Sequence, residues 1–242
     1  MIIEQTINKM NRIKLFEMAA KFQEMSTSGS IDHLSNQELI SYLVDCEYTI
    51  RENRKRSRLL RQAGLKYQSH LEELDYQAKR NLNKSMILEF TNHRWVKNKQ
   101  NILISGPTGI GKSFLACALG YHCCDHGIKT LYMRMNRYLD EVFKHRGLGD
   151  ILEYYQKLSK FTVLIIEDFG MTHLKKSASL DFLDLIEDRY LTTSTIITSQ
   201  LPLEKWYDTF SDGTVADAVC DRIFHNAYKI ELDGDSMRRT RK

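Results

Sequence analysis

Hydrophobic and polar residues follow two different patterns in this chain, and the pattern changes near residue 100. Up to that point apolar residues recur every three or four positions, as on one face of a helix, and no segment reads as a strand. The clearest helix is SNQELISYLVDCEYTI, which opens with Ser35 and Glu38 at the spacing of an N-terminal capping box. We predict that this helix continues through RENRKRSRLLRQAG and ends near Gly64.

From Asn101 onward, short apolar strands alternate with helical segments. The predicted strands are NILIS, KTLYM, FTVLIIED, STIITS and YKIEL, with helices after Lys112, twice within 136–159 and over 177–191. This alternation favours a parallel sheet that is covered by helices on both faces. We therefore expect an all-α N-terminal domain at 1–66, a linker and helix at 67–100, and an α/β domain at 101–242.

Composition adds only a little to what can be said of the class of protein, its partners and its location. The 242 residues are 42% hydrophobic and 27% charged, as in ordinary globular proteins, and the net charge of +4 is a weak indication of a polyanionic partner. The five cysteines form no CxxC pair, which favours reduced thiols over a disulfide or zinc framework. We find no apolar run long enough to span a bilayer and no signal peptide, so we expect a cytoplasmic protein without membrane contacts.

The strongest chemical motif is GPTGIGKS, which fits the phosphate-loop pattern G-x-x-x-x-G-K-[ST] and lies between a predicted strand and a predicted helix. Its glycines let successive backbone amides turn toward a phosphate, and the following helix adds its positive end. Lys112 would reach the outer phosphates and Ser113 would ligate Mg²⁺. A glycine-rich turn without a ligand is the simpler alternative. The candidate nucleotide-binding residues are Gly106, Pro107, Thr108, Gly109, Ile110, Gly111, Lys112 and Ser113.

A second candidate feature is the acid pair in VLIIEDFG. In phosphate-loop ATPases, an acidic residue ends a strand beside the loop and meets Mg²⁺ near the loop hydroxyl. Direct placement puts Glu167 at the metal and Asp168 at the attacking water. The opposite register would put Asp168 at the metal and Phe169 at the water, which leaves no base. The third possibility is that the two acids are only solvated side chains at the end of a strand, without a catalytic role.

Two polar residues further along the chain are also candidates. Gln200 follows the strand in STIITSQLP and could orient the water or sense the terminal phosphate, although polar residues at strand ends are often only solvated. Arg222, before the last strand, could face the site of a neighbouring subunit and neutralise charge there. From the residues alone, a surface salt bridge is the better explanation of Arg222.

Together, five stretches resemble the IstB-like ATP-binding proteins, helper ATPases of insertion-sequence transposition in the AAA+ class, which are similar to the helicase loader DnaC and the initiator DnaA. The stretches are GPTGIGKS, VLIIEDFG, TSQLPLEKW, DAVCDRIFHNAYKIEL and GDSMRRTRK, and the resemblance covers nearly the whole chain. It implies an AAA+ phosphate-loop fold with a five-stranded parallel sheet, ATP and Mg²⁺ as cofactors, and a location in a bacterial-type cytosol.

The resemblance also implies residue roles. Gln200 matches the first sensor, Arg222 matches an arginine finger that acts across an ATP-bridged oligomer, and Arg238 matches a second sensor for the nucleotide. Family members usually carry Asp at the position of Glu167, so this residue is a departure by one methylene. We expect nucleotide binding to survive that change and hydrolysis to be slow.

Basic residues suggest a nucleic-acid partner. The predicted N-terminal helix carries a stripe that continues toward Lys66, and MRMNRYLDEVFKHRG lies where DnaA and DnaC relatives have a DNA-contacting helix. Solvated helix faces are the alternative for each stretch taken alone. The candidate DNA contacts are Arg51, Arg54, Lys55, Arg58, Arg61, Arg134, Arg137, Lys144 and Arg146.

The leading hypothesis is an ATPase, slow and DNA-stimulated, that assembles on double-stranded DNA without sequence preference and recruits or stimulates a transposase at target DNA. A DnaC-like helicase loader is the alternative. A nucleotide-bound scaffold without turnover is a third reading, because of Glu167.

Overall fold

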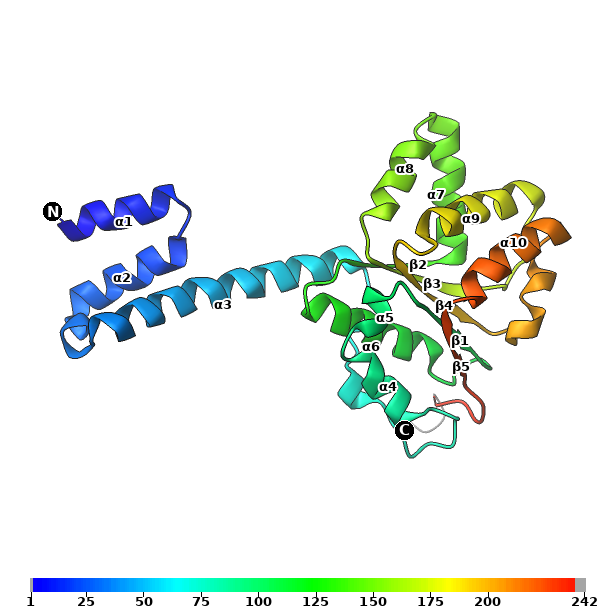
Figure 1. The fold of residues 1–242 in the computed structure, drawn as a ribbon, viewed down its shortest axis with the longest axis horizontal. Helices are drawn as coiled ribbons and strands as arrows, with labels where there is room; N and C mark the ends of the chain where they lie inside the picture. The colour runs from blue at the N-terminus through cyan, green and yellow to red at the C-terminus, as the bar shows by residue number, and fades with distance from the viewer. Residues whose placement is uncertain (1, 238–242) are drawn as a thin grey trace. The chain divides into compact units, whose positions relative to one another are not determined.

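The computed structural model describes residues 2–237 and divides the chain into two compact units, Met1–Arg58 and Leu59–Lys242. The division falls at Arg58, whereas we expected the helical domain to end at residue 66. Figure 1 shows that the first unit is helical and that the second contains the sheet.

The first unit consists of helices. They are α1 (Ile2–Arg12), α2 (Phe16–Ser28), the short 3₁₀ helix η1 (Ser30–His33) and most of α3 (Asn36–Ala63). The predicted capping box is present at the start of α3, because the Ser35 amide donates to Glu38 Oε2 (2.9 Å) and the Glu38 amide donates to Ser35 Oγ (3.3 Å). The predicted end of this helix near Gly64 is also confirmed.

Residues 67–100 pack into the second unit. They form η2 (Leu71–Glu73), α4 (Lys84–Phe90) and α5 (Arg94–Lys97). Leu71, Ile87, Phe90 and Trp95 are buried in one cluster with residues of the sheet. This segment therefore contributes apolar residues to the core of the α/β unit, rather than only connecting two domains.

The sheet has the five parallel strands that the sequence predicted. They are β1 (Asn101–Ser105), β2 (Thr130–Arg134), β3 (Val163–Phe169), β4 (Ser194–Ser199) and β5 (Ala227–Glu231), in the order β2-β3-β4-β1-β5. The remaining elements are α6 (Lys112–Asp125), α7 (Met135–Leu148), α8 (Ile151–Ser159), α9 (Lys176–Arg189), η3 (Leu203–Lys205), η4 (Tyr207–Thr209) and α10 (Gly213–Phe224).

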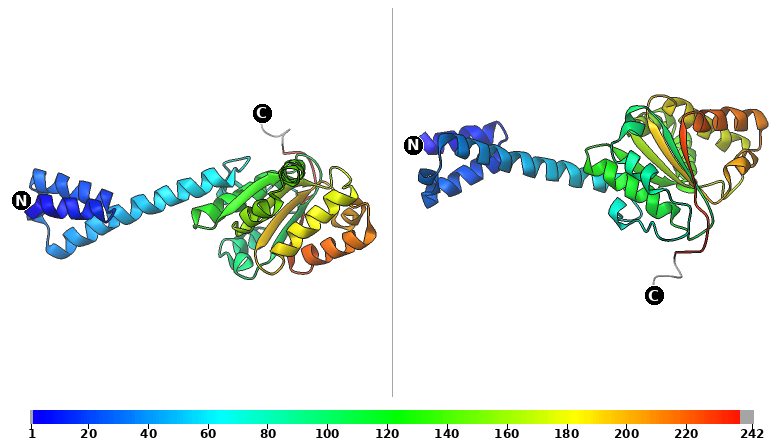
Figure 2. Two further views of the ribbon diagram at one scale, coloured as in Figure 1. Left: turned by 90° about the horizontal axis from the view of Figure 1, so that it is seen from above. Right: turned by 60° about the horizontal axis from the view of Figure 1, so that its bottom comes forward.

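Alternate residues of each strand enter two different cores, one on each face of the sheet. Ile102 and Ile104 pack in the cluster of α4, α5 and α6, whereas Leu103 packs in the cluster of α7, α8, α9 and α10. Figure 2 shows the sheet between these two layers of helices. The predicted parallel sheet with helices on both faces is therefore confirmed. Within the described residues, no helix is both long and apolar enough to cross a membrane.

One irregularity in the sheet positions functional residues. β3 pairs with β4 at Ile166 and Ile197, and the next pair is Phe169 with Ser199. Two residues of β3 thus oppose one residue of β4, which is a β-bulge. The two bulged residues are Glu167 and Asp168.

Candidate functional site

Residues 106–113 form a loop between β1 and α6, the arrangement that a phosphate loop requires. α6 begins at Lys112, so the positive end of its dipole lies at the loop. The Lys112 ammonium donates to the carbonyl oxygens of Gly106 (2.7 Å) and Pro107 (2.9 Å) and is largely buried. Lys112 therefore reaches back across the loop toward the place where phosphates bind in such loops.

Residues 232–237 pack against this loop. The Leu232 carbonyl lies so close to Gly106, whose φ is 143°, that any Cβ there would clash with backbone. The Met237 amide donates to the Gly109 carbonyl at 3.0 Å. Only glycine fits at Gly106, because both the φ angle and the space exclude a side chain. Arg238, the predicted second sensor, lies outside the described residues.

The structure brings Ser113 and Glu167 together. The Ser113 hydroxyl donates to Glu167 Oε1, although β4 lies between β1, the strand before the loop, and β3, the strand that contains Glu167. The acid strand is thus not the direct neighbour of the loop strand, and the carboxylate meets Ser113 because α6 packs across β3. In this arrangement Glu167, rather than Asp168, is the acid at the loop hydroxyl.

Glu167 is a buried carboxylate with two cations beside it. It is 1% exposed, Lys66 Nζ lies 3.0 Å from Oε1, and Arg134 Nε lies 3.6 Å from Oε2. Within the described part of the chain, Glu167 Oε2 has no hydrogen-bond partner. A hydroxyl and a carboxylate oxygen with unused lone pairs are hard oxygen donors, which suit Mg²⁺. The residues present therefore fit that ion.

The bulge separates the two acids by environment. Asp168 is partly exposed and takes a φ of +62°, a left-handed conformation that is uncommon for residues other than glycine. Its amide donates to Thr198 Oγ1 at 3.4 Å. Because of this turn, Asp168 stays accessible while Glu167 points into the protein.

Gln200 lies at the loop. The Thr108 hydroxyl donates to Gln200 Oε1 at 2.6 Å, which joins the residue after β4 to the middle of the phosphate loop. Thr108, Gln200, Ser113 and Glu167 come from three separate segments of sequence and meet at the carboxyl ends of the strands. Open α/β sheets generally bind ligands at this edge.

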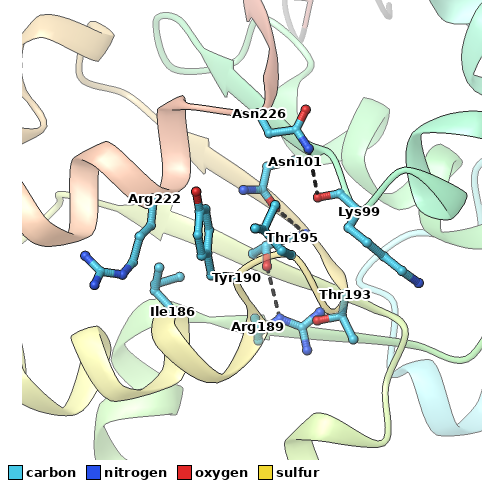
Figure 3. Close-up of a pocket in the computed structure, with 10 residues that line it drawn as sticks. Lys99, Asn101, Ile186, Arg189, Tyr190, Thr193, Thr195, Arg222 and Asn226 are labelled. Atoms are coloured by element: carbon cyan, nitrogen blue, oxygen red, sulfur yellow. Dashed lines mark hydrogen bonds between the residues drawn. The ribbon is translucent and has the colours of Figure 1, made fainter.

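Arg222 lies away from this cluster, between α10 and α9. Its guanidinium pairs with Glu187 (2.5 Å) and donates to the Ala218 carbonyl (2.7 Å). Figure 3 shows Arg222 next to Tyr190 and Ile186, at a small pocket that Arg189 and Asn226 also line. The salt bridge considered from sequence is thus present within the chain, and a role across subunits stays a prediction.

Two residues at the site were missed by sequence reasoning. Lys66 was assigned only to the basic stretch, yet its ammonium contacts Glu167. Arg80, in the segment before α4, is 4% exposed and donates to the carbonyls of Ile110 (3.2 Å) and Asp75 (2.9 Å). Burial lowers the pKa of Arg80. Neither residue belongs to a motif, so no sequence signal could have identified them.

The candidate DNA contacts fall into two groups. Arg51 pairs with Glu47, Arg54 with Glu17, Lys55 with Glu52, Arg134 with Glu167, Arg137 with Glu141 and Arg146 with Asp181. Arg58, Arg61 and Lys144 are exposed. Several of these cations therefore already have an acidic partner inside the chain. Contact with DNA stays a prediction for all of them.

The sheet order, the phosphate loop and the acid pair define the AAA+ class of phosphate-loop ATPases. Solved structures with this fold include DnaA from Aquifex aeolicus (TM-score 0.60, 21% identity, 72% of this chain and 53% of that chain). The DnaC helicase loader aligns with a TM-score of 0.57 and 16% identity over 69% of this chain and 97% of the loader. The chain thus spans about half the length of the DnaA structure. At these identities, the likeness shows the fold alone.

The chain belongs to the family of IstB-like ATP binding proteins, whose model matches residues 8–242. An insertion sequence ATP-binding protein from Sinorhizobium fredii is 37% identical over 242 residues, covering 100% of this chain and 99% of the relative. The insertion sequence IS21 ATP-binding protein of Pseudomonas aeruginosa is 26% identical over 229 residues, covering 95% of this chain and 86% of the relative. The resemblance inferred from the motifs is confirmed.

Proposed function

We propose that this protein is an ATP-hydrolysing regulator of DNA transposition, which assembles on double-stranded DNA and recruits or stimulates a transposase. The observation that carries the ATPase part is the contact between Ser113 of the phosphate loop and the buried Glu167. Membership in the family of IstB-like ATP binding proteins, with relatives encoded in insertion sequences, supports the transposition part.

The loop residues would bind the phosphates. Backbone amides of residues 106–113 and the start of α6 supply partial positive charge, and Lys112 exchanges its contacts to Gly106 and Pro107 for phosphate oxygens. Ser113 and Glu167 would hold Mg²⁺, which supplies charge neutralisation at the outer phosphates when it is bound.

The neighbouring residues would act on the attacking water. Asp168 is the partly exposed acid of the pair and would accept the proton of that water. Gln200, which lies at Thr108, would orient the water or sense the terminal phosphate. Arg222 would complete the site of an adjacent subunit, for which it has to leave Glu187.

The proposal that the protein binds DNA rests on the positive charge of its lysine and arginine side chains. Arg58, Arg61 and Lys144 are exposed, and Lys175 and Lys176 follow the acid strand. Backbone contacts of this kind give binding without sequence preference and with strong salt dependence. DNA as the partner places the proposed activity in the cytoplasm.

The main alternative is a helicase loader, favoured by the likeness of the fold to DnaC. Purification of the tagged protein from cells that contain its insertion sequence separates the two. Recovery of a transposase supports our proposal, whereas recovery of a replicative helicase without transposase supports the loader.

The ATPase assignment is tested by phosphate release and sedimentation, each with and without double-stranded DNA. We expect slow hydrolysis that DNA accelerates, and ATP-dependent assemblies on DNA. Lys112→Ala should lose ATP binding, whereas Asp168→Asn should bind ATP and stay assembled on DNA without turnover. Lys129→Ala, an exposed lysine remote from the motifs, serves as the control. Tight ATP binding by Lys112→Ala, or normal hydrolysis by Asp168→Asn, would refute these roles.

A further inference from the structure

Three histidines gather at the end of α6 that is opposite to the phosphate loop. His93 lies between α4 and α5, His122 lies in the last turn of α6, and His126 caps that helix. One ring nitrogen of each lies within 4.8 Å of a ring nitrogen of both others. The ring centroids are 4.3 to 4.9 Å apart. Two segments that are separate in sequence thus bring three imidazoles to one point.

The hydrogen bonds of these rings leave nitrogen lone pairs available. His122 Nε2 lies 3.3 Å from the Thr91 carbonyl, and His126 Nδ1 lies 2.8 Å from the His122 carbonyl. A nitrogen that faces a carbonyl must carry the proton, so the other nitrogen of a neutral ring keeps its lone pair. Histidines that bind metal usually show this pattern, because the carbonyl fixes the tautomer and the ring orientation.

His93 supplies the strongest indication. Its Nε2 is buried and, within the described residues, has no hydrogen-bond partner. A buried polar atom without a partner is costly, and such atoms call for an explanation. The residue also takes a φ of +56°, which turns the backbone so that the ring meets α6. Burial, together with His122 and His126, lowers the pKa of His93 to about 4.

Simple ring packing explains these facts less well. Stacked imidazoles bury polar nitrogens against each other without satisfying them. A cation that accepts three nitrogen lone pairs would satisfy the cluster.

We propose that His93, His122 and His126 bind one divalent transition-metal ion, for which Zn²⁺ is the best fit. Three imidazoles suit this ion, and its tetrahedral geometry needs ligand nitrogens about 3.3 Å apart, from bonds of about 2.05 Å. Small ring rotations close the observed separation, and the partial exposure of His126 leaves a fourth position for water. His122 and His126 are four residues apart, a spacing that brings two side chains to one helix face.

This site is distinct from the proposed Mg²⁺ site. Ser113 and His122 are nine residues apart on helix α6, which separates them by about 14 Å along the axis at 1.5 Å per residue. The ion would tie the connection between α4 and α5 to the end of α6, so we expect it to stabilise the α/β unit. Failure of the metal proposal would leave the ATPase proposal untouched.

The experiment uses the full-length protein without a histidine tag. Titration with Co²⁺, followed by its visible ligand-field bands, reports the coordination geometry, and calorimetry with Zn²⁺ reports stoichiometry and affinity. We expect one ion per chain, intense bands typical of tetrahedral Co²⁺, and a higher melting temperature with Zn²⁺.

The variants test the ligands. His126→Ala removes an exposed ring, so it should fold normally and bind Zn²⁺ at least ten-fold more weakly, as should His122→Ala. His33→Ala, an exposed histidine of the first unit, should bind as the unaltered protein does. Weak octahedral Co²⁺ bands, or equal Zn²⁺ affinity in His126→Ala, would overturn the proposal.

Discussion

At the scale of single residues, the most informative side chain is Glu167. Its carboxylate is buried, contacts Ser113, and is flanked by Lys66 and Arg134. The extra methylene relative to aspartate lets the group span from the bulge of β3 to the first turn of α6. Burial of a carboxylate is unfavourable unless cations or hydrogen bonds compensate it. Lys66 is therefore part of the site, as a cation that competes with Mg²⁺ for the Glu167 carboxylate.

Substitution of Lys66 tests this competition. Lys66→Ala removes the ammonium that lies 3.0 Å from Glu167. The electrostatic potential at the carboxylate becomes more negative, so Mg²⁺ is attracted more strongly. We expect half-maximal ATP hydrolysis at a several-fold lower Mg²⁺ concentration. The measurement is phosphate release over a Mg²⁺ series at saturating ATP. Lys129→Ala should follow the unaltered protein, and an identical Mg²⁺ profile for Lys66→Ala would argue against the competition.

At the scale of elements, one ion pair joins α7 to α9. Arg146 contacts Asp181, whose side chain is 9% exposed, and the hydrogen bond to that carboxylate raises the pKa of Arg146. Asp181 would be left buried without its cation if Arg146 were removed. The arginine predicted from sequence to contact DNA thus has a structural partner already.

We expect Arg146→Ala to lower the free energy of unfolding by about 2 kcal/mol, because it leaves a buried carboxylate without its charged hydrogen-bond partner. Urea unfolding followed by the fluorescence of the two buried tryptophans, Trp95 and Trp206, measures this change. Lys144→Ala is the matched control on the same helix: stability should change by less than about 0.5 kcal/mol, while DNA binding weakens. Equal stability of the two variants would contradict the structural role.

A second link joins α3 to the start of α2. Glu47 is buried and accepts from the amides of Glu17 (2.9 Å) and Met18 (3.0 Å), where the α2 dipole is positive. Burial would raise the pKa of Glu47, but the hydrogen bonds from Met18, Arg51 and Glu17 outweigh it and lower the pKa. The contribution is therefore present above the ordinary pKa of 4.5 and is lost as the pH falls through the lowered value.

Glu47→Gln should destabilise α2 by about 1–3 kcal/mol at pH 7, because hydrogen bonds to a charged acceptor are replaced by weaker ones. Hydrogen exchange of the α2 amides, corrected for intrinsic rates, measures this difference. As the pH falls below 4.5, the unaltered protein should approach the variant. A difference that does not depend on pH would show that the charge of Glu47 is unimportant.

At the scale of the whole molecule, the nucleotide site is incomplete without a second subunit if Arg222 is an arginine finger. We expect Arg222→Ala to bind ATP normally and to hydrolyse it about a thousand-fold more slowly or worse, within the range of arginine fingers, about 10³–10⁵. Mixing Arg222→Ala with Lys112→Ala should restore part of the activity, because each variant supplies what the other lacks. Phosphate release across mixing ratios measures this recovery.

Glu187→Gln is the control for this experiment, since it weakens the internal partner of Arg222 and keeps the arginine. This variant should retain hydrolysis, whereas an effect as large as that of Arg222→Ala would assign the loss to the α9–α10 ion pair. Mixtures without any recovery would remove the support for action between subunits.

The sequence by itself determined the local features of this protein. The phosphate loop, the five strands and the capping box of α3 are each encoded in a few adjacent residues, because backbone conformation and burial alternation act over short distances. The family could also be inferred from the sequence motifs. Segment 67–100 was less clear, since its apolar residues have no regular period and their burial depends on the sheet beside them.

Only the tertiary structure decided which charged and polar groups lie next to one another. Lys66 at Glu167, Arg80 at Ile110, Arg146 at Asp181 and the three-histidine cluster each join residues distant in sequence. Direct placement from the sequence already put Glu167 at the metal, and the structure adds its contact with Ser113 and the bulge in β3, which no sequence pattern indicates. Electrostatic contacts depend on separation in space, and a sequence gives separation only along the chain.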